Sequence, residues 1–206
     1  RCDTQLLYYG VNSWFVDVPK VRDRLIELNK EINWYPEHIK SGRFGKWLEG
    51  AKEWSLSRFK FWGTPLPIWK CTEEGCDGEK SVGSIEEMKN EALEIPEEDI
   101  DLHRPWVDKI KFKCDKCGGG MERVKDVIDC WYDSGSASFA QFHYPFENKE
   151  FFEKNFPSQF VAEYIGQTRA WFYYMMVLAG IIFDDIPFEN VLTTGTILNK
   201  DGKIVG

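Results

Sequence analysis

The sequence predicts an α/β fold with a parallel sheet and an inserted zinc-knuckle module. The apolar run 160–162, followed by Gly166 and a long aromatic stretch, favours a buried parallel strand that turns into a helix. Four of the six cysteines form two close pairs in a segment with few large apolar residues, as in a zinc knuckle. Hydrophobic residues make up 43% of the chain and include nine Trp, which is ample for a core.

Length and charge limit the class of protein. The 206 residues suit one large domain or a domain with an insert, and the start at Arg1 without Met favours a fragment of something longer. A net charge of −8 and a pI near 5.0 argue against phosphate-backbone binding as the main role. The apolar stretch 171–183 is too short to span a bilayer, and no secretory signal is present. We therefore expect a cytoplasmic protein without a membrane partner.

The first segment, residues 1–70, is expected to contain helices and strands. The triplet 17–19 (Asp-Val-Pro) is a helix-start signal, and Pro36 ends the helix. A second helix is predicted over 43–52. The apolar residues at helical spacing in the first helix are Val21, Leu25, Leu28 and Ile32.

The stretch 54–70 (WSLSRFKFWGTPLPIWK) is dense in aromatic residues and prolines, so a strand, a turn and an extended segment fit better than a helix. Arg58 and Lys60 alternate with aromatic residues here, which is compatible with an RNA-facing patch, because aromatic rings stack on bases and cations hold phosphates. The alternative is that the aromatic residues belong to the core and the cations are solvated.

The second segment, residues 71–123, is predicted to be a zinc-binding insert. The spacing Cys71-x4-Cys76 and Cys114-x2-Cys117, with 37 residues between the pairs, brings four thiolates to one tetrahedral metal. Such a closed site is structural, and the segment has too few apolar residues to fold well without its metal. The alternatives are a redox pair at Cys114 and Cys117, or a degenerate knuckle without metal.

The third segment, residues 124–206, carries the predicted strand–helix unit. Glu163 lies where the strand would end, and a helix N-terminus after a strand favours anions and carbonyl-bearing ligands. A parallel strand is expected over 187–194, followed by a hairpin or strand–loop. Asp129 and Asp133 suggest an acid/base pair, with helix capping or a turn as the alternative.

The order of motifs resembles the isoleucyl branch of the class I aminoacyl-tRNA synthetases over nearly the whole chain. The leucyl and valyl branches share the architecture, but WYDSG followed by QTRAWFYY looks like the isoleucyl version. The motifs that carry the resemblance are WGTPLPIW, LHRPWVD, DVIDCWYDSG, HYPFEN, EYIGQTRAWF, PFENVLTTG and GTILNKDGK.

The resemblance implies the segment after the editing insertion, which is the second half of a Rossmann-like catalytic domain. The HIGH signature belongs to the first half, and the KMSKS loop should follow GTILNKDGK, where this sequence instead reads Ile204-Val205-Gly206. The family commonly has Asp at the position of Gly166 and Gly at that of Ala170, so a contact made by that Asp is not carried over.

The resemblance also implies ligand contacts, and no catalytic residue of its own. Substrate-binding residues would be Trp131, Glu163, Gln167 and Trp171. ATP-binding residues would be Glu163, Gly195, Ile197 and Leu198. The cysteine spacing adds the predicted metal ligands Cys71, Cys76, Cys114 and Cys117, which would hold structural Zn²⁺.

The expected function is therefore that of a part of an ATP-dependent isoleucine–tRNA ligase, inactive by itself. Isoleucine, ATP with Mg²⁺ and tRNA(Ile) would be the ligands of the full-length enzyme. The alternatives are a zinc-dependent nucleic-acid-binding module, or the same segment of a valyl or leucyl enzyme. Adenylate formation requires positioning and charge stabilisation more than a protein nucleophile, which agrees with the lack of a catalytic triad.

Overall fold

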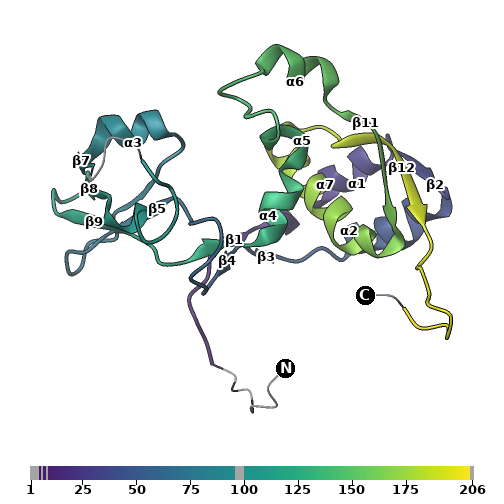
Figure 1. Cartoon of the computed structure of the whole chain (residues 1–206), viewed down its shortest axis with the longest axis horizontal. Helices are drawn as coiled ribbons and strands as arrows, with labels where there is room; N and C mark the ends of the chain where they lie inside the picture. Colours follow the sequence, from purple (N-terminus) through teal and green to yellow (C-terminus); the bar gives the residue numbers. More distant parts are fainter. Residues whose placement is uncertain (1–4, 6, 8, 96–99, 205–206) are drawn as a thin grey trace. The chain divides into compact units, whose positions relative to one another are not determined.

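The computed structural model describes residues 5, 7, 9–95 and 100–204. The chain folds into two compact units (Figure 1). The cysteine-bearing unit comprises Arg1–Val16 and Ser55–Val127, and the parallel-sheet unit comprises Asp17–Trp54 and Ile128–Gly206. The segment boundaries predicted at residues 70 and 123 stay a prediction. Four two-residue strands lie near the ends of these stretches: β1 (Phe15–Val16), β3 (Trp54–Ser55), β4 (Ser57–Arg58) and β10 (Val127–Ile128).

The parallel-sheet unit is built on three parallel strands in the order β11-β12-β2 (Figure 1). These are β11 (Ser158–Tyr164), β12 (Phe188–Thr194) and β2 (Asn33–Tyr35). The helices of the unit are η1 (Val18–Lys20), α1 (Arg22–Asn29), η2 (Lys40–Phe44), α2 (Gly45–Glu49), α4 (Cys130–Gly135), α5 (Ala137–Ala140), α6 (Lys149–Asn155), η4 (Ile165–Arg169) and α7 (Trp171–Ile182). The α/β fold with a parallel sheet predicted from the sequence is confirmed.

One face of this sheet is covered by an aromatic core. The ring of Trp34 on β2 lies 4.6 Å from that of Phe44 and makes edge contacts with Phe172 of α7 and Phe188 of β12. α1 and α7 come close together at Gly180, where a Cβ would lie 2.3 Å from Leu25 Cδ2.

The other face is open in the described residues, and here the prediction of a buried strand at 160–162 is wrong. Phe160 is 60% exposed, and so are Leu192 and Tyr35, which pair with each other on the neighbouring strands, at 39% and 56%. The physical reason is that β11 pairs only with β12 among the described strands, while side chains alternate between a covered and an uncovered face. The strand itself and its parallel pairing are confirmed.

Two helices begin differently from the prediction. The polar residues expected in the first turn of the aromatic helix form the separate 3₁₀ helix η4, because Thr168 Oγ1 donates to the Ile165 carbonyl at 2.7 Å. The helix predicted over 43–52 is a short π-helix, η2, followed by α2. The absence of a side chain at Gly45 allows this turn, since a Cβ there would lie 2.7 Å from the Lys40 carbonyl oxygen.

The cysteine-bearing unit contains a five-stranded antiparallel sheet in the order β6-β5-β9-β8-β7. Its strands and helices are β5 (Ile68–Cys71), β6 (Glu79–Ser81), α3 (Ile85–Glu91), β7 (Ala92–Glu94), η3 (Val107–Lys109), β8 (Lys111–Lys113) and β9 (Gly120–Arg123). Ser84 caps α3 by accepting from Glu87 N–H at 3.0 Å. A small core lies beneath the sheet, made of Trp69, Val82, Met88, Val107, Ile110, Phe112, Cys114 and Met121.

Candidate functional site

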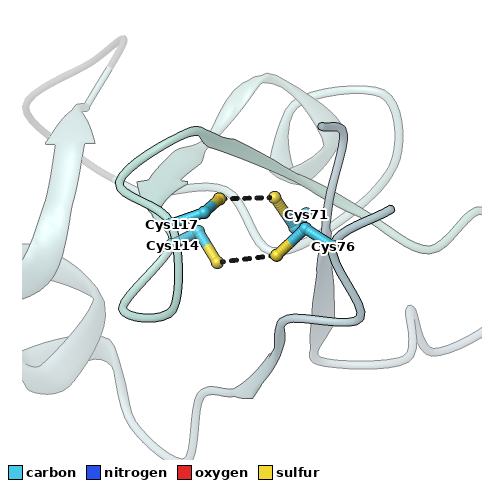
Figure 2. Close-up of side chains that lie close together, drawn as sticks. All are labelled: Cys71, Cys76, Cys114 and Cys117. Atoms are coloured by element: carbon cyan, nitrogen blue, oxygen red, sulfur yellow. Dashed lines mark hydrogen bonds between the residues drawn. The ribbon is translucent and has the colours of Figure 1, made fainter. Parts of the chain in front are cut away.

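The four predicted metal ligands converge at one end of the five-stranded sheet (Figure 2). Cys71 ends β5 and Cys114 follows β8, while Cys76 and Cys117 lie in the turns that follow them. Sγ of Cys71 lies 3.4 Å from Sγ of Cys117, and Sγ of Cys76 lies 3.8 Å from Sγ of Cys114. All four sulfurs lie within 4.8 Å of one another, so each knuckle contributes half of a single cluster.

Backbone geometry forms the two knuckles. Gly75 and Gly118 have φ values of +80° and +78°, which other residues adopt only with strain. The Cys114 N–H donates to the Gly119 carbonyl at 2.8 Å, which closes the second knuckle. At Gly78 a Cβ would lie 2.4 Å from Sγ of Cys114, so a side chain there would displace this thiol.

The thiols differ in how readily they lose a proton. The backbone N–H of Cys117 and that of Lys116 lower the pKa of Cys114 to about 7. For Cys71 the backbone N–H of Glu73 lowers the pKa, but burial and the other thiols together raise it to about 12. A bound cation would favour the thiolate form of all four residues.

This donor set fits a tetrahedral metal ion. With metal–sulfur distances of about 2.3 Å, a tetrahedron places its sulfurs about 3.8 Å apart. Two of the sulfur pairs, at 3.4 and 3.8 Å, already approach that spacing. Four thiolates would leave no position for substrate, so such an ion would be structural.

The second candidate site lies at the carboxyl ends of β11 and β12. Glu163 pairs in register with Thr193, one residue before both strands end, and its Oε2 accepts from the Tyr164 N–H at 3.1 Å. The other predicted ATP-binding residues follow directly after β12 and are Gly195, Ile197 and Leu198. Ile197 is 76% exposed, and the Leu198 backbone makes a bridge with Ile204 that confirms the predicted hairpin or strand–loop.

Two helices position the other predicted substrate-binding residues. Trp131 lies in the first turn of α4, and Trp171 begins α7. The indole N–H of Trp171 donates to the Ser134 carbonyl of α4 at 2.9 Å, which fixes the Trp171 ring against that helix. Gln167 Oε1 accepts from the Trp171 backbone N–H at 3.0 Å, so this amide supplies a partner at the start of α7.

Asp129 has the capping role that the sequence left open. Its carboxylate accepts from the Trp131 backbone N–H at 3.4 Å and from the Trp54 indole N–H at 2.9 Å. Because Asp129 is 3% exposed and held by these two donors, it serves as the N-cap of α4.

Sequence reasoning missed two features of the structure. One is the contact of Trp131 with Tyr174, whose rings stack at 5.4 Å and 14°. The spacing of Trp171 and Tyr174, three residues apart in one aromatic run, could have indicated it. The other is Asp108, which binds two arginines within the cysteine-bearing unit.

The aromatic residues near Arg58 lie on the surface of their unit. Phe59 is 81% exposed and Trp62 is 74% exposed, so the alternative that places them in the core is wrong. The Arg104 guanidinium lies 4.6 Å from the ring centre of Phe61. Arg58 itself donates to the Ser55 carbonyl at 2.7 Å.

A parallel sheet with polar and apolar groups at its strand ends, together with a four-cysteine unit, agrees with a class I synthetase. The family model described as tRNA synthetases class I (I, L, M and V) matches residues 3–205. The chain therefore belongs to this family, which confirms the predicted resemblance. None of the described helices is both long and apolar enough to cross a membrane.

Several curated relatives of the chain are isoleucine–tRNA ligases. The chain is 54% identical over 202 residues to that of Clostridium tetani, and 53% identical over 203 residues to that of Treponema denticola. The relative from Bifidobacterium longum is 48% identical over 209 residues. Each match covers 98% of this chain but 18–19% of the relative, so the chain spans about a fifth of their length.

One solved structure supports the fold. The ternary complex of Agrobacterium radiobacter K84 agnB2 LeuRS with tRNA and LeuAMS is 22% identical, with a TM-score of 0.53. The match covers 76% of this chain and 21% of that chain.

Proposed function

We propose that this chain supplies one wall of the isoleucyl-adenylate site of a cytoplasmic isoleucine–tRNA ligase, and that it is inactive alone. The observation that carries the proposal is the placement of Glu163 and Gly195 at the ends of two adjacent parallel strands. Ligands of open α/β sheets bind at this edge. The relatives, which are about five times longer, are isoleucine–tRNA ligases.

Each of the predicted site residues would contact the part of the ligand that suits its chemistry. Trp131 and Trp171 would contact the branched side chain of isoleucine, with Gln167 beside it, and Glu163 would contact the adenylate. Gly195 has no neighbour within 4 Å of its would-be Cβ, which leaves space for adenine, and Ile197 and Leu198 would line it. Among the described residues, one face of the sheet is uncovered and one edge of β11 has no partner strand. The rest of the synthetase would pack there, because parallel sheets are buried on both faces.

The test is isoleucine-dependent exchange between ATP and pyrophosphate in the presence of Mg²⁺. We expect none from the 206-residue chain, whereas clear exchange would refute its inactivity. A chimera in which this chain replaces the matching segment of the Clostridium tetani enzyme should be active with isoleucine, like its parent. Preference of the chimera for valine or leucine would instead assign the chain to that branch.

The cysteine cluster would hold Zn²⁺ as a structural ion. Its support is the all-thiolate donor set with sulfurs within 4.8 Å of one another. Metal analysis should find about one equivalent of zinc, lost in Cys71→Ser and kept in the control Cys130→Ser, because Cys130 lies outside the cluster. Zinc-free folded protein would contradict this assignment.

A second candidate function is nucleic-acid binding by the cysteine-bearing unit, favoured by the exposure of Phe59 and Trp62. Exposed rings stack on unpaired bases, each contributing about 1–3 kcal/mol. Binding of tRNA by the chain should then weaken with salt and fall in Trp62→Ala, but not in the control Trp106→Ala, whose ring is also exposed. Equal binding by both variants would exclude this function.

A further inference from the structure

A closed ring of contacts in the parallel-sheet unit links four residues, which are Trp131, Tyr174, Trp54 and Asp129. The Trp131 ring stacks on Tyr174 of α7, and Tyr174 contacts the ring of Trp54 at 4.6 Å. The indole N–H of Trp54 donates to Oδ2 of Asp129 at 2.9 Å. Asp129 in turn accepts the backbone N–H of Trp131 at 3.4 Å, so the ring returns to its starting residue.

This ring fixes both the backbone and the side chain of Trp131. The cap holds the first turn of α4, and the stack holds the plane of the indole. Trp54 and Asp129 are 5% and 3% exposed, so their hydrogen bond is shielded from water. Trp131 is only half-buried, which leaves part of its surface accessible to a ligand.

The close approach of the two helices makes the stack possible. A Cβ at Gly135 in α4 would lie 3.1 Å from both Leu178 Cδ1 and the backbone of Tyr174. A larger residue would push α4 away from α7 and separate Trp131 from Tyr174. Trp171 is tied to the same helix through the Ser134 carbonyl, so α4 sets the positions of both indoles.

We infer that Tyr174 is a positioning residue that determines amino-acid specificity by fixing the plane of Trp131. This inference rests on the proposed function, in which Trp131 contacts the side chain of isoleucine. Tyr174 acts through Trp131 and does not itself touch the substrate. Without the ring of Tyr174, the indole of Trp131 can tilt. The apolar slot for the isoleucine side chain then loses the width that separates isoleucine from amino acids of different shape.

The experiment uses the Clostridium tetani chimera and measures kcat and KM of ATP–pyrophosphate exchange with isoleucine and with leucine. In Tyr174→Ala, KM for isoleucine should rise about tenfold with kcat nearly unchanged, as for the loss of a strong aromatic pair. Discrimination against leucine should fall. Tyr174→Phe keeps the ring and should restore both values. The control Phe183→Ala removes a ring that packs on Phe139 and Phe156 at the other end of α7 and should leave discrimination unchanged.

The outcomes separate this inference from the proposed function. If Trp131→Ala leaves KM for isoleucine unchanged, the proposed function fails. If Trp131→Ala raises KM but Tyr174→Ala does not, only the inference fails. A second measurement, ¹⁹F NMR of the 206-residue chain labelled with 5-fluorotryptophan, does not depend on activity. The Trp131 resonance, assigned with Trp131→Phe, should shift in Tyr174→Ala and stay in place in Tyr174→Phe, and an unmoved resonance in Tyr174→Ala would overturn the inference.

Discussion

The carboxylate of Asp108 lies 2.7 Å from Nε of Arg123, whose side chain is fully buried. Oδ2 of the same carboxylate accepts from Arg104 Nε at 3.0 Å. Both guanidinium groups also donate to backbone carbonyls at the two stretches where the chain enters and leaves the five-stranded sheet. These are Leu66 and Asp126 for Arg123, and Lys60 and Lys125 for Arg104. One carboxylate therefore orients two arginines, and these hold together the stretches before β5 and after β9.

Replacing Asp108 by Asn should destabilise this unit. Asn has the same shape but no charge, so the buried Arg123 would lose its counter-ion, which typically costs about 3 kcal/mol. Urea unfolding of the chain, followed by Trp fluorescence, measures the change in the free energy of unfolding. The control Asp101→Asn alters a carboxylate whose side chain is 40% exposed, so it should change the free energy of unfolding little. Equal stability of both variants would show that the stability of the cysteine-bearing unit does not depend on this ion pair.

The same pair predicts how stability depends on pH. Burial raises the pKa of Asp108, but hydrogen bonds from Arg123 and Arg104 outweigh it and hold the pKa below its ordinary value. A carboxyl whose pKa is lower in the folded state stabilises the fold above its unfolded pKa, about 3.9, and loses this contribution as pH falls through the folded value. The stability advantage over Asp108→Asn should stay constant from pH 7 to about 4 and shrink below it. An advantage that grows toward acid would contradict this sign.

The sequence predicted the parts of the molecule that depend on local pattern. Cysteine spacing identified the residues that converge, and the apolar run at 160–162 identified β11. The sequence could not predict the exposure of Phe160, because exposure depends on which neighbours a strand has in space. Nor could it pair Trp54 with Asp129, since 75 residues separate them and only the tertiary fold brings them together.

The thiolate cluster should tolerate no side chain at Gly78. A Cβ there would lie 2.4 Å from Sγ of Cys114, so Gly78→Ala should displace this ligand and weaken zinc binding by about tenfold or more. Competition with a chromophoric chelator measures the affinity. The matched control is Gly83→Ala, where the nearest atom lies at 3.6 Å, and it should bind zinc like the unchanged chain. Unchanged affinity in Gly78→Ala would mean that the cluster can expand.

The Trp54–Asp129 hydrogen bond should matter more than the apolar surface of Trp54. Trp54→Phe keeps an aromatic ring beside Tyr174 but leaves the Asp129 carboxylate without its indole donor. The loss of a buried hydrogen bond to a carboxylate costs about 1–3 kcal/mol. The double variant Trp54→Phe with Asp129→Asn removes the charge and should cost less than the sum of the two single variants. Strict additivity in urea unfolding would show that the two residues act independently.

Gly135 should be required for the contact between α4 and α7. Alanine is normally more favourable than glycine in a helix by about 1 kcal/mol, so Gly135→Ala would stabilise α4 if there were space for the methyl. The added methyl would lie 3.1 Å from Leu178 Cδ1 and 3.1 Å from the backbone of Tyr174. Because a backbone cannot rotate away as a side chain can, there is no space for the methyl. Overpacking of this kind costs about 1–3 kcal/mol, so we expect a net loss of stability of about 1 kcal/mol.

The matched control is Gly42→Ala, within η2, where no atom lies within 4 Å of the would-be Cβ. It should leave the free energy of unfolding unchanged or raise it by a few tenths of a kcal/mol. A Gly135→Ala variant as stable as Gly42→Ala would show that α4 can move away from α7 at little cost. The ring of contacts around Trp131 would then be looser than the 14° stack with Tyr174 indicates.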